Sequence, residues 1–334
     1  MAFISVVVPV YYNAESLSLL TERLASVTAS LTEDDFEFVF VDDGSGDNSF
    51  EILQRLAQSD PRIRVVKLSR NFGSNAAILA GLTYAHGDAA VVISADLQDP
   101  PELIPQLVAS WKQGNQVVLA ARRSRQDPIV AKLFATLFNR LFRKFVFADF
   151  PPDGFDFMLI DRCVVDILVQ LQEKNSYIFG QTMWVGFQRD VIYYDRQERG
   201  IGRSRWTTAK KIKYFIDAFS AFSYLPLRMA SLLGIVFAVV GFLYALVIIG
   251  LRLTMGFPIV GWASLMVVVL LASGAQLVVA GTLGEYLWRI LDETRRRPPF
   301  IVDSLVNLDS FPDASPRNLL LARREWPTSE KGNS

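Results

Sequence analysis

The sequence predicts an α/β domain with a mostly parallel sheet, followed by interfacial helices and a two-helix transmembrane hairpin. Three observations support this prediction. Five β-branched runs alternate with helical stretches in the first 121 residues, two long uncharged stretches follow them, and basic residues flank those stretches. The 334 residues carry a formal net charge of zero, so no overall field would attract nucleic acid.

The α/β part rests on the spacing of its apolar runs. We expect strands at 3–8, 36–41, 63–68, 89–93 and 116–120, and helices at 14–31, 48–58, 74–85 and 101–112. Continuous apolar strands separated by helices are typical of a parallel sheet that is covered on both faces.

A polar cluster follows each of these strands. The clusters begin at Pro9, Asp42, Ser69, Ser94 and Arg122. In open α/β sheets, ligands bind beyond the carboxyl ends of the strands. We therefore expect the five clusters to converge on one edge of the sheet and to form a site there.

The composition limits the kinds of site that this edge can hold. The single cysteine, Cys163, excludes an internal disulfide, and with the single histidine, His86, it cannot build a Cys/His metal cluster. A metal would need oxygen ligands, which favours Mg²⁺ or Mn²⁺. A dinucleotide fingerprint is not supported, because Gly44 and Gly46 follow the second strand and lack a third glycine.

The membrane part rests on two apolar stretches at about 229–251 and 260–284. Each is long enough to cross the hydrocarbon core of a bilayer. The short turn between them holds one basic residue, Arg252, whereas the outer flanks are rich in arginine and lysine. The positive-inside rule then places both flanks, and both termini, in the cytoplasm. The chain begins with a strand-like run and not with a signal peptide, so we expect a plasma-membrane (inner-membrane) protein with two spans.

These patterns divide the chain into four parts. Residues 1–206 form the cytoplasmic α/β domain, 207–226 a juxtamembrane amphipathic helix, 227–288 the hairpin, and 289–334 a partly disordered cytoplasmic tail. The helical stretch 128–147 has one apolar and one basic face. Packing on the core and contact with the membrane remain equally open for it.

Asp96 and Gln98 are the candidate metal ligands. Residues two apart in an extended segment point to the same side, so their oxygens could hold one hard cation. Such a cation could neutralise a diphosphate leaving group.

Three motifs resemble the inverting family-2 glycosyltransferases with the GT-A fold: VVPVYYN from Val7, VDDGS from Val41 and ADLQDPP from Ala95. Two further segments, GFDFMLIDR from Gly154 and RGIGRSRW from Arg199, are similar to the branch that glycosylates dolichyl and undecaprenyl phosphate, particularly the bactoprenol glucosyltransferases. Dolichyl-phosphate mannose synthase is a related enzyme. The resemblance covers about residues 3–300.

The resemblance implies roles for individual residues in a catalytic domain at 1–206. The nucleotide would lie against Pro9, Tyr11, Glu15, Asp42 and Asp43. Asp96 and Gln98 would hold Mg²⁺ or Mn²⁺ on the donor diphosphate, and Asp156 would act as catalytic base or orient the acceptor. The donor and acceptor phosphates would be held by Arg122, Lys132, Thr136, Arg199, Ser204 and Arg205.

Several of these residues also have plainer interpretations. Asp156 could be a carboxylate at a helix N-terminus, the 199–205 segment a basic patch on anionic lipid, and Tyr11 strand-end packing. The family commonly has Asp-Ala-Asp where this chain has Ser94-Ala95-Asp96. The predicted metal site therefore lacks one charge.

The expected reaction moves glucose from UDP-glucose to a polyisoprenyl phosphate and inverts the anomeric centre. GDP-mannose or a modified arabinose donor remain alternatives, as does a catalytically impaired scaffold of the same fold. A processive polysaccharide synthase is disfavoured, because two spans cannot build a translocation channel. The glycines of the hairpin, such as Gly234 and Gly241, favour a homo-oligomer, with a tetramer as one option. A separate flippase would have to move the product.

Overall fold

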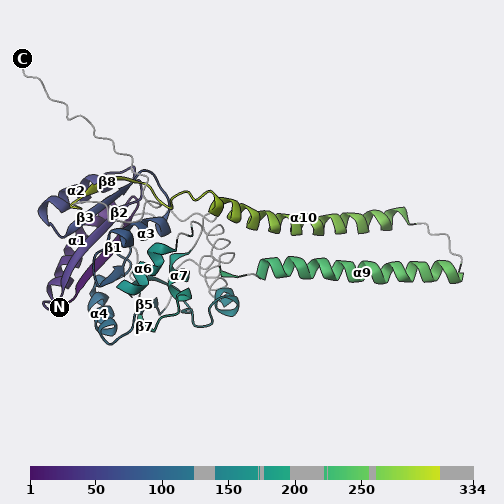
Figure 1. The fold of residues 1–334 in the computed structure, drawn as a ribbon, viewed down its shortest axis with the longest axis horizontal. Helices are drawn as coiled ribbons and strands as arrows, with labels where there is room; N and C mark the ends of the chain where they lie inside the picture. The colour runs from purple at the N-terminus through teal and green to yellow at the C-terminus, as the bar shows by residue number, and fades with distance from the viewer. Residues whose placement is uncertain are drawn as a thin grey trace, which may run out of the picture. The chain divides into compact units, whose positions relative to one another are not determined.

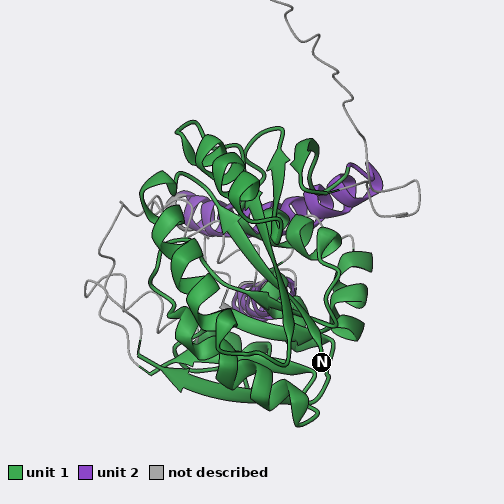
Figure 2. Cartoon of the chain, turned by 90° about the vertical axis from the view of Figure 1, so that its left-hand side faces the viewer, with its two compact units in different colours: residues 1–212, 298–334 green, residues 213–297 purple. Residues whose placement is uncertain are grey.

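The computed structural model describes residues 1–123, 140–171, 173, 177–195, 222–223, 225–255 and 261–308. Two compact units divide the chain, Met1–Ile212 with Pro298–Ser334 as the first and Lys213–Arg297 as the second. Figure 2 colours them separately. The first unit is an α/β domain, and the second is a pair of long helices (Figure 1).

An eight-stranded sheet, counted over the described residues, is the frame of the first unit. Its strand order is β7-β5-β6-β4-β1-β2-β3-β8. The strands are β1 (Phe3–Val10), β2 (Asp35–Asp42), β3 (Ile63–Leu68), β4 (Ala89–Val92), β5 (Val117–Arg122), β6 (Phe155–Asp161), β7 (Arg189–Tyr194) and β8 (Val302–Val306). The five strands expected from the sequence are confirmed as β1 to β5.

The direction of each strand decides which ends share an edge. Strands β4, β1, β2 and β3 are parallel. β6 lies antiparallel between β4 and β5, so β5 again runs in the direction of β4, and β7 is parallel to β5. The predicted mostly parallel sheet is therefore confirmed, with β6 and β8 as its antiparallel members.

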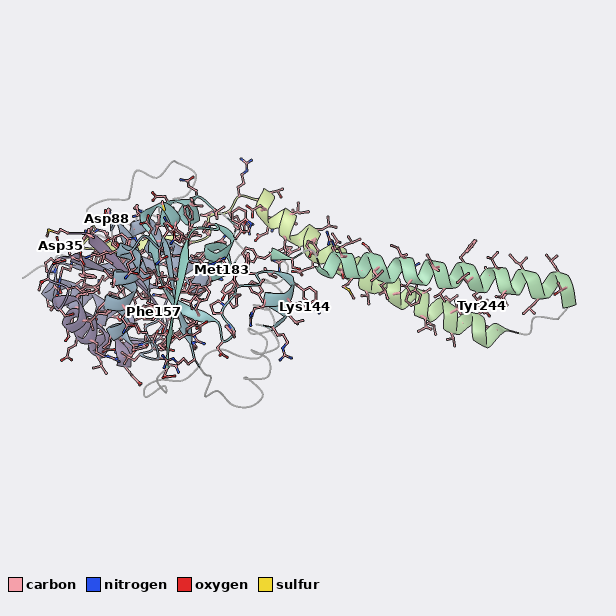
Figure 3. All side chains as sticks on the ribbon, turned by 90° about the horizontal axis from the view of Figure 1, so that it is seen from below. Asp35, Asp88, Lys144, Phe157, Met183 and Tyr244 are labelled. Carbon is pink, nitrogen blue, oxygen red and sulfur yellow. The ribbon has the colours of Figure 1, made fainter. Side chains whose placement is uncertain are left out.

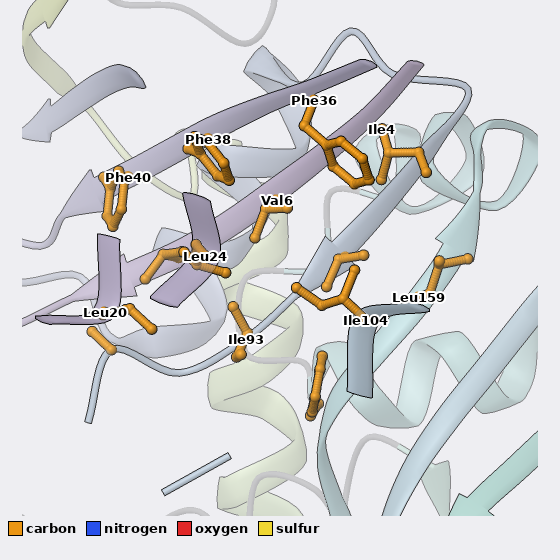
Figure 4. Packing of buried hydrophobic residues seen from close by; sticks show 14 of the residues in the cluster. Ile4, Val6, Leu20, Leu24, Phe36, Phe38, Phe40, Ile93, Ile104 and Leu159 are labelled. Carbon is orange, nitrogen blue, oxygen red and sulfur yellow. The ribbon is translucent and has the colours of Figure 1, made fainter. Parts of the chain in front are cut away.

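Helices cover both faces of the sheet. On one face, α1 (Ala14–Ala29), α2 (Ser49–Ser59) and α4 (Ile104–Lys112), which follows the 3₁₀ turn η1 (Pro101–Leu103), cover the aromatic side of β2. Figure 4 shows Leu20 and Leu24 of α1 beside Val6 and the three phenylalanines Phe36, Phe38 and Phe40. This dry cluster explains the alternation of phenylalanine along β2, because every second side chain points to the same face.

The opposite face carries α3 (Ser74–Tyr84), α6 (Arg162–Gln170) and α7 (Ile178–Trp184). Helix α3 packs tightly on β1 at Gly81, where an added Cβ would lie 2.3 Å from the Val7 side chain. Residues on both sides of the central strands are thus buried, as parallel strands with continuous apolar runs require.

The strand β8 comes from the region that the sequence analysis assigns to the tail. It pairs antiparallel with β3, and the Asn307 side chain donates hydrogen bonds to the carbonyl oxygens of Ala57 and Ile63 at 2.7 and 2.9 Å. Its five residues, Val302–Val306, are too few and too mixed to predict a strand without the neighbouring edge of β3.

The described part of the second unit contains α9 (Leu225–Met255) and α10 (Trp262–Thr294), which contact each other. Among the described residues, Leu227–Leu251 and Leu265–Thr294 are long and apolar enough to cross a membrane. Most of their large apolar side chains are exposed, among them Tyr244, and Figure 3 draws these side chains as sticks along both helices. A helix that is apolar on all sides is typical of a lipid environment.

Candidate active site

One edge of the sheet collects the carboxyl ends of β1 to β5 and the amino end of β6. This follows from the strand directions, and the register places Ala121 opposite Phe155. Asp42, Asp96, Arg122 and Asp156 come to this edge from four different strands or the turns that follow them. The predicted convergence of polar clusters therefore agrees with the topology.

The turns after β1 and β2 hold each other through backbone and side-chain hydrogen bonds. The Tyr12 amide donates to Ser45 Oγ at 3.0 Å, and the Tyr11 amide donates to Asn13 Oδ1 at 3.0 Å. Pro9 and Tyr11 are partly buried, and Glu15 is exposed in the first turn of α1. These three predicted nucleotide residues thus lie along one continuous stretch at the end of β1.

Asp42 is completely buried at the end of β2. Its Oδ1 accepts a hydrogen bond from the Ser45 amide at 3.2 Å, whereas Oδ2 has no hydrogen-bond partner among the described residues. Burial raises the pKa of this carboxyl. A buried acceptor without a donor is costly, so the edge carries an acceptor that a ligand hydroxyl or N–H could satisfy.

Asp43 supports the loop that follows β3. Its carboxylate accepts hydrogen bonds from the amides of Phe72 and Gly73 at 2.7 and 2.9 Å. Burial raises the pKa of Asp43 to about 6. At Gly44, φ is +67° and an added Cβ would lie 2.5 Å from the carbonyl carbon of Arg70. Asp43 and Gly44 therefore fix the position of the 70–73 loop, which borders the candidate site.

The segment that carries Asp96 and Gln98 is a turn, so the expectation of an extended segment is wrong. Leu97, between them, has a φ of 60°, a left-handed conformation that bulky residues rarely adopt. The Gln98 amide donates to Asp96 Oδ1 at 3.2 Å. The turn, and not strand alternation, thus sets the positions of the two side chains.

Asp156 is the second residue of β6, which excludes the interpretation as a helix N-terminal carboxylate. Its side chain is 44% exposed and forms an ion pair with Arg122, whose side chain is only 4% exposed. The sequence analysis assigns Arg122 to a phosphate. In the structure, the guanidinium contacts the carboxylate proposed to act on the acceptor.

Two residues of the edge were missed by the sequence analysis as site residues. Asp99 is completely buried, and its Oδ1 accepts a hydrogen bond from the Tyr194 hydroxyl at 2.5 Å. Asp99 belongs to the quoted ADLQDPP motif, so a signal existed for it. Tyr194 ends β7, and nothing in its local sequence distinguishes it from the neighbouring Tyr193.

The side chains near Asp96 show whether the described residues fit the predicted metal site. The described residues contain no group of three His, Cys, Asp or Glu side chains that could hold a metal ion. Mg²⁺ is usually bound by one or two carboxylates together with substrate phosphates and water. One carboxylate from Asp96 and one amide from Gln98 therefore fit a cation that the substrate helps to hold.

The remaining predicted residues lie outside the described part of the chain. They are Lys132, Thr136, Arg199, Ser204 and Arg205. The amphipathic helix expected at 207–226 also lies largely outside the described residues, which include only 222–223 and 225–226 of it. Of the helix expected at 128–147, residues 140–145 are helical.

Comparison with known proteins identifies the family. Residues 5–166 match glycosyl transferase family 2. The uncharacterised glycosyltransferase YkcC of Bacillus subtilis is 41% identical over 92% of this chain and 95% of its own length. A bactoprenol glucosyl transferase of Shigella phage SfV is 37% identical over 90% of this chain and 97% of its own length.

A distant likeness to solved structures accompanies these relatives. Glucosyl-3-phosphoglycerate synthase from Mycobacterium tuberculosis is 18% identical, with 66% of this chain and 79% of the other covered and a TM-score of 0.46. The family assignment rests on the sequence relatives, which match along nearly their whole length. The chain therefore belongs to glycosyl transferase family 2 and is a glycosyltransferase with a GT-A fold.

Proposed function

We propose that this glycosyltransferase moves a glucosyl group from UDP-glucose to a polyisoprenyl phosphate at the cytoplasmic face of a membrane. The observation that carries the proposal is the likeness to the bactoprenol glucosyl transferase over 300 residues. That match leaves about 34 of the 334 residues outside it, fewer than α9 and α10 together contain. The likeness therefore extends into the apolar helices and is not confined to the α/β domain.

The chemistry needs little proton transfer, because the second pKa of a phosphate monoester is near 6. At neutral pH the acceptor phosphate is already a nucleophile. One of its oxygens attacks the anomeric carbon of glucose while the bond from that carbon to the diphosphate oxygen breaks, and UDP leaves. In-line attack inverts an α-linked donor to a β-linked lipid sugar. Positioning and charge stabilisation would then supply most of the rate.

The edge of the sheet offers groups for both tasks. Asp96 and Gln98 would hold Mg²⁺ or Mn²⁺, which when bound neutralises charge on the leaving diphosphate. The unpartnered oxygen of Asp42 would accept a hydrogen bond from the nucleoside. Asp156 would orient the acceptor, and its ion pair with Arg122 limits the repulsion between this carboxylate and an incoming phosphate.

The phosphate groups would also contact residues outside the described part of the chain. Lys132 and Thr136 would hold the lipid phosphate, and Arg199, Ser204 and Arg205 the donor side. These assignments follow from the family resemblance alone.

The proposed orientation follows from charge. Arg228 lies in the first turn of α9, and Arg295, Arg296 and Arg297 follow α10, whereas Arg252 lies near the opposite end of α9. Basic flanks favour the cytoplasmic side, where nucleotide sugars are made. The α/β domain and both termini would then be cytoplasmic.

The test is a transfer assay with the full chain in detergent, undecaprenyl phosphate and Mg²⁺ or Mn²⁺. Radiolabelled UDP-glucose, GDP-mannose and a nucleotide arabinose are compared, and the lipid extract is analysed by mass spectrometry. We expect label in the lipid with UDP-glucose. Asp156→Asn should lower turnover by about 100-fold, because the acceptor is no longer held in position, and Asp166→Asn, in a solvent-exposed ion pair on α6, should leave turnover unchanged. Absence of labelled lipid with every donor would refute the proposal.

An inactive scaffold of the same fold is favoured by one observation, the serine at position 94. Wild-type turnover discriminates between the two functions. A scaffold would also stay inert after Ser94→Asp, whereas an impaired enzyme would gain activity.

A further inference from the structure

A row of neighbouring side chains connects the turn that carries Asp96 with Asp156 on β6. Its members are Asp96, Ser94, Asp99, Tyr194, Arg122 and Asp156. Ser94 Oγ lies 2.8 Å from Asp96 Oδ1 and 2.7 Å from Asp99 Oδ2. The other oxygen of Asp99 accepts the Tyr194 hydroxyl at 2.5 Å. Tyr194 lies opposite Arg122 in the register of β7 and β5, and Arg122 pairs with Asp156.

The centre of this row is dry. Asp99 is 0% exposed, and Tyr194 and Arg122 are each 4% exposed. A buried charge is stable only when it is paired and hydrogen-bonded, and here Asp99 and Arg122 are opposite charges with the Tyr194 hydroxyl between them. Burial and the neighbouring Asp99 raise the pKa of Tyr194, whereas Arg122 opposes the rise. The phenol therefore keeps its proton and donates it to Asp99, and Arg122 lies opposite it on the neighbouring strand.

The row connects groups with different proposed tasks. Asp96 belongs to the turn that would hold the donor diphosphate, and Asp156 is the residue that would orient the acceptor. Their strands, β4 and β6, already fix the backbone, but the side chains at the strand ends need their own restraints. Hydrogen-bonded networks in a low-dielectric interior are stiff, because breaking one member leaves the others unsatisfied.

We propose that Asp99 and Tyr194 are positioning residues that hold the Asp96 turn and the Arg122–Asp156 pair in a fixed relation. The proposal rests on the proposed function, since it assigns donor and acceptor sides to the site. It predicts that the two ends respond to each other through the Tyr194 hydroxyl. Neither residue touches the reacting atoms.

The first experiment removes this hydroxyl with Tyr194→Phe, which keeps the ring. Tyr193→Phe is the matched control, because Tyr193 is the preceding residue of β7, points to the other face and is 48% exposed. We expect Tyr194→Phe to lower kcat by roughly 10- to 100-fold, since a misplacement of about 1 Å can cost 100-fold. KM for the nucleotide sugar should stay within about 2-fold of wild type, because uniform binding of the donor is kept.

Two outcomes of this experiment would overturn the proposal. One is an unchanged kcat in Tyr194→Phe. The other is an equal loss in Tyr193→Phe, which would indicate a general effect of strand β7 and not the hydroxyl. Circular dichroism and thermal unfolding of both variants show whether each is folded before the kinetics are compared.

A second experiment does not depend on turnover. The Nε–H of Arg122 is buried and gives an NMR signal that can be assigned by its loss in Arg122→Lys. Ser94→Ala perturbs the far end of the row, so we expect it to shift the Arg122 signal in wild type and to leave it unmoved in Tyr194→Phe. A shift of equal size in both backgrounds, or none in wild type, would overturn the proposal.

The two experiments separate the failure of the positioning role from failure of the proposed function. If wild type transfers no sugar to lipid but Ser94→Ala moves the Arg122 signal only when Tyr194 is present, the row is real and the proposed reaction is wrong. If wild type is active and Ser94→Ala leaves the Arg122 signal unmoved, the proposed reaction is supported and the positioning role is refuted.

Discussion

Ser94→Asp tests the charge balance of the turn at the end of β4. The wild-type hydroxyl lies within hydrogen-bond distance of two carboxylates, Asp96 at 2.8 Å and Asp99 at 2.7 Å. An aspartate at position 94 would add a third carboxylate to this group, with no cation within the turn itself. The variant restores the acidic residue that the family commonly has, so it also tests whether the serine limits activity.

Two effects set the loss of folding stability that we expect from Ser94→Asp: charge repulsion and protonation. Two unit charges about 4 Å apart repel by about 4 kcal/mol at an effective dielectric constant of 20, and the new carboxylate faces two of them. It can escape by taking up a proton, which at pH 7 costs about 1.36 kcal/mol for each of the roughly three units above its usual pKa. Protonation therefore caps the destabilisation at about 4 kcal/mol. For a domain of this size, that corresponds to a fall in Tm of roughly 8–16 °C.

The assay is thermal unfolding of the full chain in detergent at pH 7, with EDTA or with excess Mn²⁺ and UDP. We expect Ser94→Asp to melt well below wild type in EDTA and to recover in Mn²⁺ with UDP, because a bound cation turns repulsion into ligation. Ser94→Asn is the matched control, since it has the shape of aspartate without the charge. It should lose little stability and gain nothing from the metal. Equal melting of the aspartate and asparagine variants in EDTA would refute the reasoning.

Three other predictions concern two residues beside the site and the anchoring of β8. Gly44→Ala should lower Tm more than Gly114→Ala, because both glycines have positive φ but only at Gly44 would the new Cβ meet backbone, 2.5 Å away; equal shifts would contradict this. The raised pKa of Asp43, about 6 against 3.8 in the unfolded chain, makes its contribution to stability greatest below the unfolded pKa. That contribution, about 3 kcal/mol in all, is lost progressively as pH rises from about 4 to 6, so the free energy of unfolding should fall between pH 4 and pH 7.5, a pH dependence that Asp43→Asn lacks. Asn307→Ala removes two hydrogen bonds that anchor the end of β8 and should cost about 1–3 kcal/mol in chemical denaturation; an unchanged midpoint would show that the strand is held without them.

The sequence alone predicts the central strands and their helices because burial on both faces leaves a local signal. Strands β1 and β4 are short, almost entirely apolar runs, and β2 and β3 are apolar at most of their positions. The spacing of these strands requires crossover helices. The two apolar helices can be predicted from the local sequence for a similar reason, since a lipid environment requires apolar residues on every side of a helix. The polar clusters that end the strands could be assigned to one edge by topology without any coordinates.

What the sequence could not provide is the pairing of distant segments. β8 forms a strand only because it pairs with β3. Asp156 is a strand residue because β6 pairs with both β4 and β5. The error about Asp96 and Gln98 has a similar cause, since a left-handed Leu97 is stabilised by packing and not by local preference.

Tyr194 shows this division most clearly. In sequence it is one of two adjacent tyrosines, and only the direction in which β7 enters the sheet decides which of them is buried against Asp99. The identity of each side chain determined what chemistry the edge can hold. The tertiary structure decided which of those side chains meet, because a hydrogen bond between residues 95 positions apart exists only after the strands between them have paired.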